Sequence, residues 1–366
     1  MNEKTLILTH PLTGNYGGLL QAFASYTVLN NLGCNAYIYR YQPDDFPVKS
    51  FSWLKYYGSL LKLILGKKGS LVWRSLYIAN KFAGRMKFVR EPQVALTDDD
   101  IRYYVGSDQV WRATYCRKMR SPEYYFLNFA TAAQRRKSIA YAASFGVDEW
   151  EGNEAETSVC AKLVQEFKAV SVREDSGVGI CQKAFGVNAV QMPDPTLILE
   201  RGEYENIINK ARTRANKSPW LSTYILDESP EIVRLVHDCS DAMKLFHQAL
   251  LPNRAADRWQ DRIALTVPQW LRFIRDSEYF VTDSFHGCVF AIIFNKPFVC
   301  LGNEQRGSAR FKSLLGTFGL TGRLLTNPSP EEMQRVLSTP IDWLRVNEIR
   351  AAERARAIAF LVDNLA

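Results

Sequence analysis

Residues 282–287, "TDSFHG", place an acid, a hydroxyl and one of the four histidines of the chain between two apolar runs. The run before them predicts a strand, and "GCVFAIIFN" predicts the buried helix that follows, so His286 is expected at a helix N-terminus. The positive end of a helix disfavours imidazolium, and His286 in that place would give up a proton readily. We therefore take His286 as a candidate acid; a histidine packed passively in the core is the alternative.

Polar and aromatic residues also follow the strand predicted over residues 101–105, in the stretch "GSDQVWR". Asp108 and Gln109 could bond sugar hydroxyls, and Trp111 could offer a ring face to the C–H side of a sugar. Asp108 could also act as a general base toward an acceptor hydroxyl, or it could simply cap a helix.

A glycine-rich turn, "TGNYGGLLQ", stands between the first predicted strand and a helix. Such a turn lets backbone N–H groups approach an anion or a sugar closely. Asn15, Tyr16, Gly17 and Gln21 are the candidate ligand contacts there, and a tight turn without a ligand is the alternative reading.

An arginine, Arg173, follows the strand predicted over residues 169–172 in "SVRED". The guanidinium fork binds two oxygens at once, which suits a carboxylate or a phosphate. A purely structural pairing with Glu174 or Asp175 is the alternative.

Short β-branched or aromatic runs alternate with helical patterns and predict the elements that position these residues. The strands predicted in the first half are residues 5–9, 36–39, 101–105, 138–142, 169–172 and 189–192, and those in the second half lie in "LSTYIL", "EYFVTDS" and "KPFVCL". This alternation predicts an α/β fold of two Rossmann-like, doubly wound parallel sheets facing each other across a cleft. Ligands of such sheets bind beyond the carboxyl ends of the strands, where the candidate residues stand.

The length of 366 residues predicts two domains. We place an N-terminal, acceptor-side domain at residues 1–205, a C-terminal, donor-side domain at residues 206–345, and a terminal helix at residues 346–366. The composition, 47% apolar and 23% charged, is that of a globular protein, and no apolar run is long enough to span a bilayer. Seven scattered cysteines without a Cys-x-x-Cys pair indicate reduced thiols, with neither a disulfide framework nor a metal site.

The net charge of +8 is concentrated in residues 50–90, which hold nine basic residues and no acidic one. Trp53, Leu54, Tyr57 and further apolar residues form one stripe of a helix, with Lys55 and Lys62 opposite. We read this insertion either as a contact with an anionic membrane or as a helix that covers the core of its own domain. Nucleic acid is not expected as a partner, because no recognition motif is present.

With these motifs combined, the chain resembles the polysaccharide pyruvyl transferase family. The matching segments occur in the same order along nearly the whole chain: Asn15-Tyr16-Gly17 with Leu20-Gln21, "GSDQVW" at 106–111, "SVRE" at 171–174, Asp194-Pro195-Thr196, "SFHG" at 284–287 and "NKPF" at 295–298.

The resemblance implies a fold similar to the GT-B glycosyltransferases and a transfer of pyruvate from phosphoenolpyruvate onto a sugar as a ketal. Family members often carry Arg-Leu-His where this chain has Ser284-Phe285-His286, and that Arg and His, with the Arg of the "SVRE" motif, hold phosphoenolpyruvate. Serine at position 284 leaves the phosphate short of a ligand, which Arg306 or Arg310 is expected to supply.

The chemistry needs an acid, a base and cations, and no cofactor or metal. His286 and Asp108 are the expected catalytic residues. The expected donor-binding residues are Arg173, Ser284, Phe285, Arg306 and Arg310, and the expected acceptor-binding residues are Asn15, Tyr16, Gly17, Gln21, Gln109 and Trp111.

The partners implied by the resemblance are phosphoenolpyruvate and a lipid-linked oligosaccharide of capsule or exopolysaccharide synthesis. The enzyme would then be cytoplasmic and peripheral at the inner face of the membrane, held there by residues 50–90. A GT-B glycosyltransferase that uses a nucleotide sugar and a non-catalytic carbohydrate- or membrane-binding protein are the competing readings.

Overall fold

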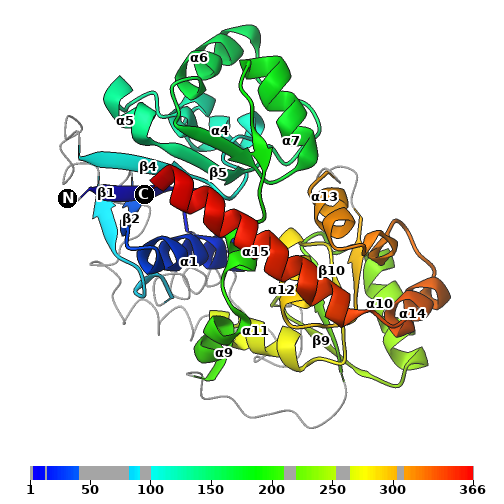
Figure 1. The fold of residues 1–366 in the computed structure, drawn as a ribbon. Coiled ribbons are helices and arrows are strands. Elements are labelled where there is room, and N and C mark those ends of the chain that lie inside the picture. The colour runs from blue at the N-terminus through cyan, green and yellow to red at the C-terminus, as the bar shows by residue number, and fades with distance from the viewer. Residues whose placement is uncertain are drawn as a thin grey trace, which may run out of the picture.

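The computed structural model describes residues 3–12, 15–40, 82–90, 100–209, 220–252, 264–302 and 309–365. These residues form two sheets, one of seven and one of five strands, in which every pair of neighbours is parallel (Figure 1). The two-sheet α/β architecture predicted from the sequence is confirmed.

The first sheet has the order β3-β2-β1-β4-β5-β6-β7. Its strands are β1 (Lys4–Leu8), β2 (Asn35–Arg40), β3 (Phe88–Arg90), β4 (Ile101–Val105), β5 (Ile139–Ala143), β6 (Ala169–Val172) and β7 (Val190–Gln191). All residues of β4 and β5 are buried, as expected of central strands covered on both faces. Side chains alternate between the two faces, so Tyr104 joins one core cluster while Tyr103 and Val105 join the other.

The second sheet has the order β12-β11-β10-β8-β9. Its strands are β8 (Trp220–Tyr224), β9 (Phe246–Ala249), β10 (Tyr279–Thr282), β11 (Phe298–Leu301) and β12 (Leu324–Leu325). The predicted strands 101–105 and 169–172 have the observed bounds of β4 and β6, whereas the sequence pattern does not predict β3, β9 and β12.

Helices lie on both faces of the first sheet, with α1 on one side and α5, α6 and α7 on the other (Figure 1). The described helices of the first unit are α1 (Tyr16–Asn31), α4 (Ala113–Met119), η2 (Pro122–Phe126), α5 (Ala132–Lys137), α6 (Glu154–Val164), α7 (Asp175–Ile180) and η3 (Cys181–Phe185). They are followed by α8 (Pro195–Ile198), α9 (Arg201–Asn209), α10 (Pro230–Ala242), α11 (Val267–Asp276), α12 (Phe285–Ile293), α13 (Ala309–Thr317), η6 (Thr321–Arg323), α14 (Pro330–Ser338) and α15 (Trp343–Leu365).

The C-terminal helix α15 connects the two units. It crosses from the second sheet back to the first, and its end lies beside β1 and β4 (Figure 1). There the buried Arg102 of β4 donates to the carbonyl of Leu365 at 2.5 Å. Halfway along α15, Arg354 donates to the carbonyl of Ile198 at 2.7 Å. The predicted terminal helix is thus present, and it begins three residues earlier than residue 346.

The predicted domain boundary at residue 205 falls inside α9. This helix packs on the second unit, where Glu205 pairs with Arg275 at 2.6 Å and Tyr204 lies edge-on to Phe290. The change from one unit to the other therefore comes before α9.

Most of the predicted basic insertion, residues 50–81, lies outside the described residues. The predicted amphipathic stripe lies in that part; of the remainder, residues 88–90 form β3, which pairs with β2 at the edge of the first sheet. Phe82, Ala83 and Met86 are buried in the core of that unit. In the part of the chain that is described, no helix has the length and apolarity needed to cross a membrane.

Candidate active site

A buried carboxylate, Asp194, lies where the two units meet. One of its oxygens, Oδ2, accepts from Arg173 Nη1 at 2.8 Å and from the Ser107 hydroxyl at 2.9 Å, and lies 3.6 Å from His286 Nε2. The other, Oδ1, accepts from the backbone N–H and the hydroxyl of Thr196. Asp194 thus joins polar residues that follow β4, β6 and β10, which is where a ligand of parallel sheets is expected.

Asp194 is held as a carboxylate by its neighbours. Burial alone would raise its pKa, but the imidazole of His286 and the guanidinium of Arg173 outweigh that effect and hold the pKa well below its usual range. A fixed negative charge at this point stabilises positive charge on both His286 and Arg173.

His286 is positioned by the turn between β10 and α12. The Ser284 hydroxyl accepts from the backbone N–H of Gly287 and caps α12, so the histidine occupies the first turn of that helix as predicted. His286 is buried, and within the described structure its Nε2 has no hydrogen-bond partner apart from the longer approach to Asp194. Gly17 of α1 packs against the ring so closely that an added Cβ would lie 2.1 Å from His286 Nδ1.

Two arginines from different units approach the ring of Phe285. The guanidinium carbon of Arg173 lies 4.3 Å from the ring centroid, and that of Arg310, at the start of α13, lies 5.9 Å from it. Arg173 Nε and Nη2 and Arg310 Nε are buried, and no described residue accepts a hydrogen bond from them. Burial and the charge of Arg173 lower the pKa of Arg310 to about 10. Arg306 lies outside the described residues.

The pairing of Arg173 with Glu174 or Asp175 is ruled out as its structural role, because its ion pair is with Asp194. Glu174 is buried and instead accepts from the Ser144 hydroxyl and from the backbone N–H of Gly146.

Asp108 faces the same region from the turn after β4. It does not cap a helix, since α4 begins at Ala113; its Oδ1 accepts from the backbone N–H of Gln109 at 2.8 Å. Burial would raise the pKa of Asp108, but the nearby His10, His286 and Arg173 lower it below the usual value. Gly106 makes this turn possible, because its φ is +140° and an added Cβ would lie 2.0 Å from the carbonyl oxygen of Tyr141.

Two predicted acceptor contacts are corrected by the structure. Trp111 is fully buried, stacks on Phe126 at 4.8 Å and donates its indole N–H to the carbonyl of Tyr125, so it is a core residue and not a platform for a sugar. Gln21 is fully buried and bonded at both ends of its amide, to Thr9 and to the backbone N–H of Ser107. It braces the turns after β1 and β4, and its amide has its hydrogen-bond partners within the protein.

The other predicted acceptor residues occupy varied positions. Asn15 is exposed and caps α1 by accepting from Gly17. Tyr16 joins the two units, because it stacks on Trp270 at 5.2 Å and donates to the carbonyl of Leu265 at 2.6 Å. Gln109 accepts from Arg112 within the first unit. Two of the six lie against predicted catalytic side chains: Gly17 packs on His286, and the backbone N–H of Gln109 donates to Asp108 Oδ1.

Three site residues receive no role from the sequence pattern. Asp194 and Ser107 stand after strand ends, in "MPDPT" and "GSDQ", and that position is the available signal. His10 also follows a strand, two residues after β1; its Nδ1 lies 3.1 Å from the Tyr125 hydroxyl, and its Nε2 is buried without a partner among the described residues.

The described residues contain no cluster of three or more His, Cys, Asp or Glu side chains arranged to hold a metal ion. All seven cysteines are free, and six of them are buried. Burial raises the pKa of Cys116 and Cys181 to about 12, so these thiols stay protonated.

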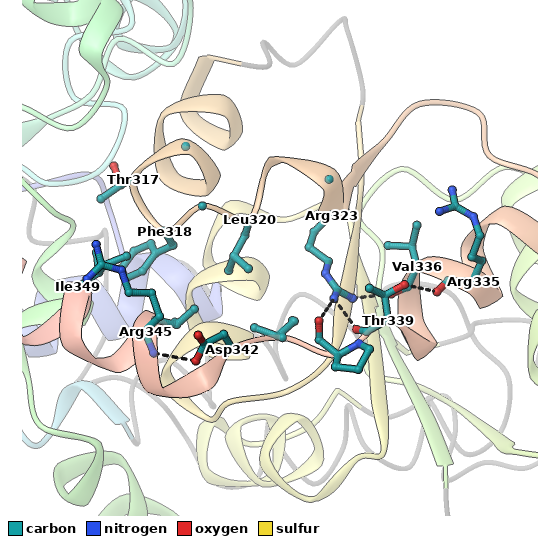
Figure 2. A pocket seen from close by; sticks show the side chains of 16 residues that line it. Thr317, Phe318, Leu320, Arg323, Arg335, Val336, Thr339, Asp342, Arg345 and Ile349 are labelled. Carbon is teal, nitrogen blue, oxygen red and sulfur yellow. Dashed lines mark hydrogen bonds between the residues drawn. The ribbon is translucent and has the colours of Figure 1, made fainter.

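A separate cavity of about 630 Å³ lies in the second unit, between the end of α13, α14 and the start of α15 (Figure 2). Arg323 points toward the end of α14 and donates to the carbonyls of Val336 and Thr339. Arg335 and Arg345 stand at the rim with exposed side chains. By contrast, the cavity beside Arg173, Asp194 and Phe285 has a volume of only about 20 Å³.

Three solved structures with which the chain can be superposed share 11–12% of its sequence. UDP-N-acetylglucosamine 2-epimerase from Rickettsia bellii is 11% identical with a TM-score of 0.44, and the match covers 98% of this chain and 96% of that one. A point mutant of the O-GlcNAc transferase of Thermobaculum terrenum is 12% identical with a TM-score of 0.39, and the match covers 99% of this chain and 65% of that one. Phytolacca americana UGT2 complexed with UDP-2-fluoro-glucose and pterostilbene is 12% identical with a TM-score of 0.36, and the match covers 97% of this chain and 93% of that one. These values are too low to transfer an activity or a site.

A search of curated proteins finds no match to the chain. The family model for polysaccharide pyruvyl transferase, however, matches residues 15–305, which is well over half of the sequence and includes Asp108, Arg173, Asp194 and His286. On this match, and in agreement with the resemblance of its motifs, the chain belongs to the polysaccharide pyruvyl transferase family.

Proposed function

We propose that the protein transfers pyruvate from phosphoenolpyruvate onto a sugar of a lipid-linked polysaccharide precursor and closes it as a cyclic ketal. Membership of the family makes it a pyruvyl transferase of polysaccharide synthesis. The observation that carries the finer proposal is the pair Arg173 and Arg310, which approach one ring from different units with three buried donor nitrogens that no described residue satisfies.

An anion of high charge explains this pair of arginines. Buried donors without a partner are costly, and so are two buried guanidinium groups near each other. Phosphoenolpyruvate carries a carboxylate and a phosphate, and its oxygens would satisfy the free N–H groups and neutralise the charges. Arg310 is thus proposed to replace the phosphate-binding arginine that family members often carry at position 284. The hydroxyl of Ser284 itself caps α12.

His286 is proposed as the acid. The methylene carbon of phosphoenolpyruvate must gain a proton, which makes C2 electrophilic, and His286 stands beside the arginines with a buried Nε2 that makes no hydrogen bond to the described residues. Asp194 at 3.6 Å stabilises the ring while it carries that proton. The rings of Phe285 and His286 lie perpendicular to each other, with their centroids 5.3 Å apart.

The remaining steps are the attack of one sugar hydroxyl on C2, the departure of phosphate, and the attack of a second hydroxyl that closes the ring. Asp108 faces His286 and Arg173 and is proposed to hold the acceptor hydroxyls, with Asn15 and Gln109 in the turns that flank the site. None of these steps requires a metal or a cofactor.

Membrane association is part of the proposal and rests on the basic character of residues 50–90, most of which are outside the described structure. Flotation with anionic liposomes at low salt should carry the protein into the lipid fraction, and flotation with neutral liposomes should not. Equal behaviour with the two lipids would remove this part of the proposal.

The direct test is incubation with phosphoenolpyruvate and a synthetic galactoside. Phosphate should be released, and the product should gain the mass of a pyruvate ketal. His286→Ala should abolish both, while His237→Ala, at an exposed histidine of α10, should leave both unchanged. Gain of a hexose from a nucleotide sugar in the same assay would instead identify a glycosyltransferase, and near-parental activity of His286→Ala would remove this residue from the mechanism.

A further inference from the structure

A second histidine, His10, stands in the candidate site outside the part of the chain that the family model matches, which begins at residue 15. It follows β1, whose last residue Leu8 pairs with Val105 of β4, and Asp108 comes three residues after Val105. Both side chains therefore start from the same edge of two neighbouring strands. His10 Nε2 is buried and has no hydrogen-bond partner in the described part of the chain.

The other ring nitrogen of His10 is fixed. Nδ1 lies 3.1 Å from the Tyr125 hydroxyl, and the two rings meet edge to face at 5.1 Å. Tyr125 is buried, and its carbonyl accepts the indole N–H of Trp111. A histidine anchored through one nitrogen, with the other left without a partner, is the arrangement expected when the free nitrogen serves a ligand.

We propose that His10 is the general base that takes the proton of the acceptor hydroxyl, with Asp108 as the carboxylate that stabilises the resulting imidazolium. This inference rests on the proposed function. It divides the acid–base work between the units: His286 of the second unit serves the donor and His10 of the first serves the acceptor.

The charges around the two groups favour this division. The pKa of Asp108 is held below its ordinary value, so its carboxylate would retain a hydroxyl proton poorly. Burial lowers the pKa of His10, against the effect of Asp108, which raises it; the backbone at Gln109 also raises it and Arg173 lowers it. The net effect lowers the pKa of His10, which keeps the ring neutral at pH 7, the form that can accept a proton.

The proton balance is complete without a further reagent. The hydroxyl proton passes to His10 Nε2 as the O–C2 bond forms, and phosphate leaves C2 with the electron pair of its C–O bond. The His10 proton goes to that phosphate, and the neutral ring then accepts the proton of the second hydroxyl as the ketal closes. This second proton passes through solvent to restore His286, which gave its own to the methylene carbon.

The test compares His10→Asn with Tyr125→Phe and the exposed His237→Asn. Asparagine can keep the bond to the Tyr125 hydroxyl but lacks a titrating Nε2. His10→Asn should lower kcat by about 10²-fold or more, leave KM for phosphoenolpyruvate unchanged, and abolish the fall of kcat/KM toward acid that His10 protonation causes. Tyr125→Phe, which loses only the anchor, should cost less, and His237→Asn should match the parent.

A parental kcat and a parental pH profile in His10→Asn would overturn the inference, whereas absence of phosphate release by the parent would overturn the proposed function. A second measurement does not need turnover. In protein with labelled histidines, the galactoside should shift the His10 imidazole resonances, and phosphoenolpyruvate alone should shift chiefly those of His286. His10 imidazole resonances that do not shift when the galactoside is added would also overturn the inference.

Discussion

The cluster of polar side chains around Asp194, where the two units meet, differs from the cavity between α13, α14 and α15 in volume and in the hydrogen bonding of its arginines. The cavity is about 630 Å³ in volume and the space beside Asp194 about 20 Å³. Yet the buried arginine of the cavity, Arg323, donates to backbone carbonyls, while the arginines of the cluster keep buried N–H groups that no described residue satisfies. Under the proposed function, the unsatisfied buried donors mark the site and the larger volume does not.

The contrast has a physical cause. Arg323 lies at the C-terminal end of α14, where it donates to the carbonyls of Val336 and Thr339, and its positive charge suits the negative end of the helix. Arg173 has one partner in Asp194 and two nitrogens that nothing in the described part of the protein satisfies. Buried donors without a partner lower the free energy of unfolding, and a bound ligand that accepts their hydrogen bonds would restore it.

The largest expected effect comes from Arg173→Met. It removes the side chain proposed to bind phosphoenolpyruvate and leaves Asp194 buried without its guanidinium. Phosphate release should therefore fall by about 10³-fold or more, and the free energy of unfolding by about 3–5 kcal/mol. The double variant with Asp194→Asn should recover much of the stability and none of the activity. Denaturant unfolding and the phosphate assay measure the two quantities, and recovery of activity in the double variant would contradict the donor role.

A smaller effect is expected from Gly17→Ala, which tests the fit of α1 against His286. An added Cβ would lie 2.1 Å from His286 Nδ1, so the ring must move and kcat should fall by about 10²-fold. The matched control is Gly18→Ala, whose nearest neighbour would be Asp108 Oδ2 at 3.5 Å, an ordinary contact. Equal activity of the two variants would show that the position of His286 does not depend on Gly17.

The sequence predicts the strands and strand ends better than the roles of the residues beyond them. The buried runs of β4 and β6 have clear boundaries, and Arg173 and His286 follow β6 and β10 as expected. The predictions for Trp111 and Gln21 are wrong, since position after a strand does not tell whether a side chain turns into the core or toward the cleft. The sequence does not show that Asp194 contacts Arg173, Ser107 and His286, because these partners are 21, 87 and 92 residues away. Only the packing of the two units brings them together.

The short edge strands escape prediction for a different reason. β12 has two residues and β3 has three, too few for an alternating pattern to show. The sequence of β9, "FHQA", is half polar and largely exposed, so it lacks the apolar signal of a central strand.

The smallest effects on activity are expected in the cavity of the second unit. Variants of its arginines should differ in stability according to what each arginine contacts. Arg335→Ala and Arg345→Ala remove exposed side chains that pair weakly with Glu332 and Glu348, so the free energy of unfolding should change by less than about 0.5 kcal/mol. Arg323→Ala removes the buried guanidinium that donates to the carbonyls of Val336 and Thr339 and should cost about 2 kcal/mol. None of the three should alter phosphate release, because the buried guanidinium of this cavity already has its partners in the protein. A loss of activity in the rim variants at unchanged stability would instead mean that this cavity takes part in the reaction, and that unsatisfied donors alone do not mark where the substrates bind.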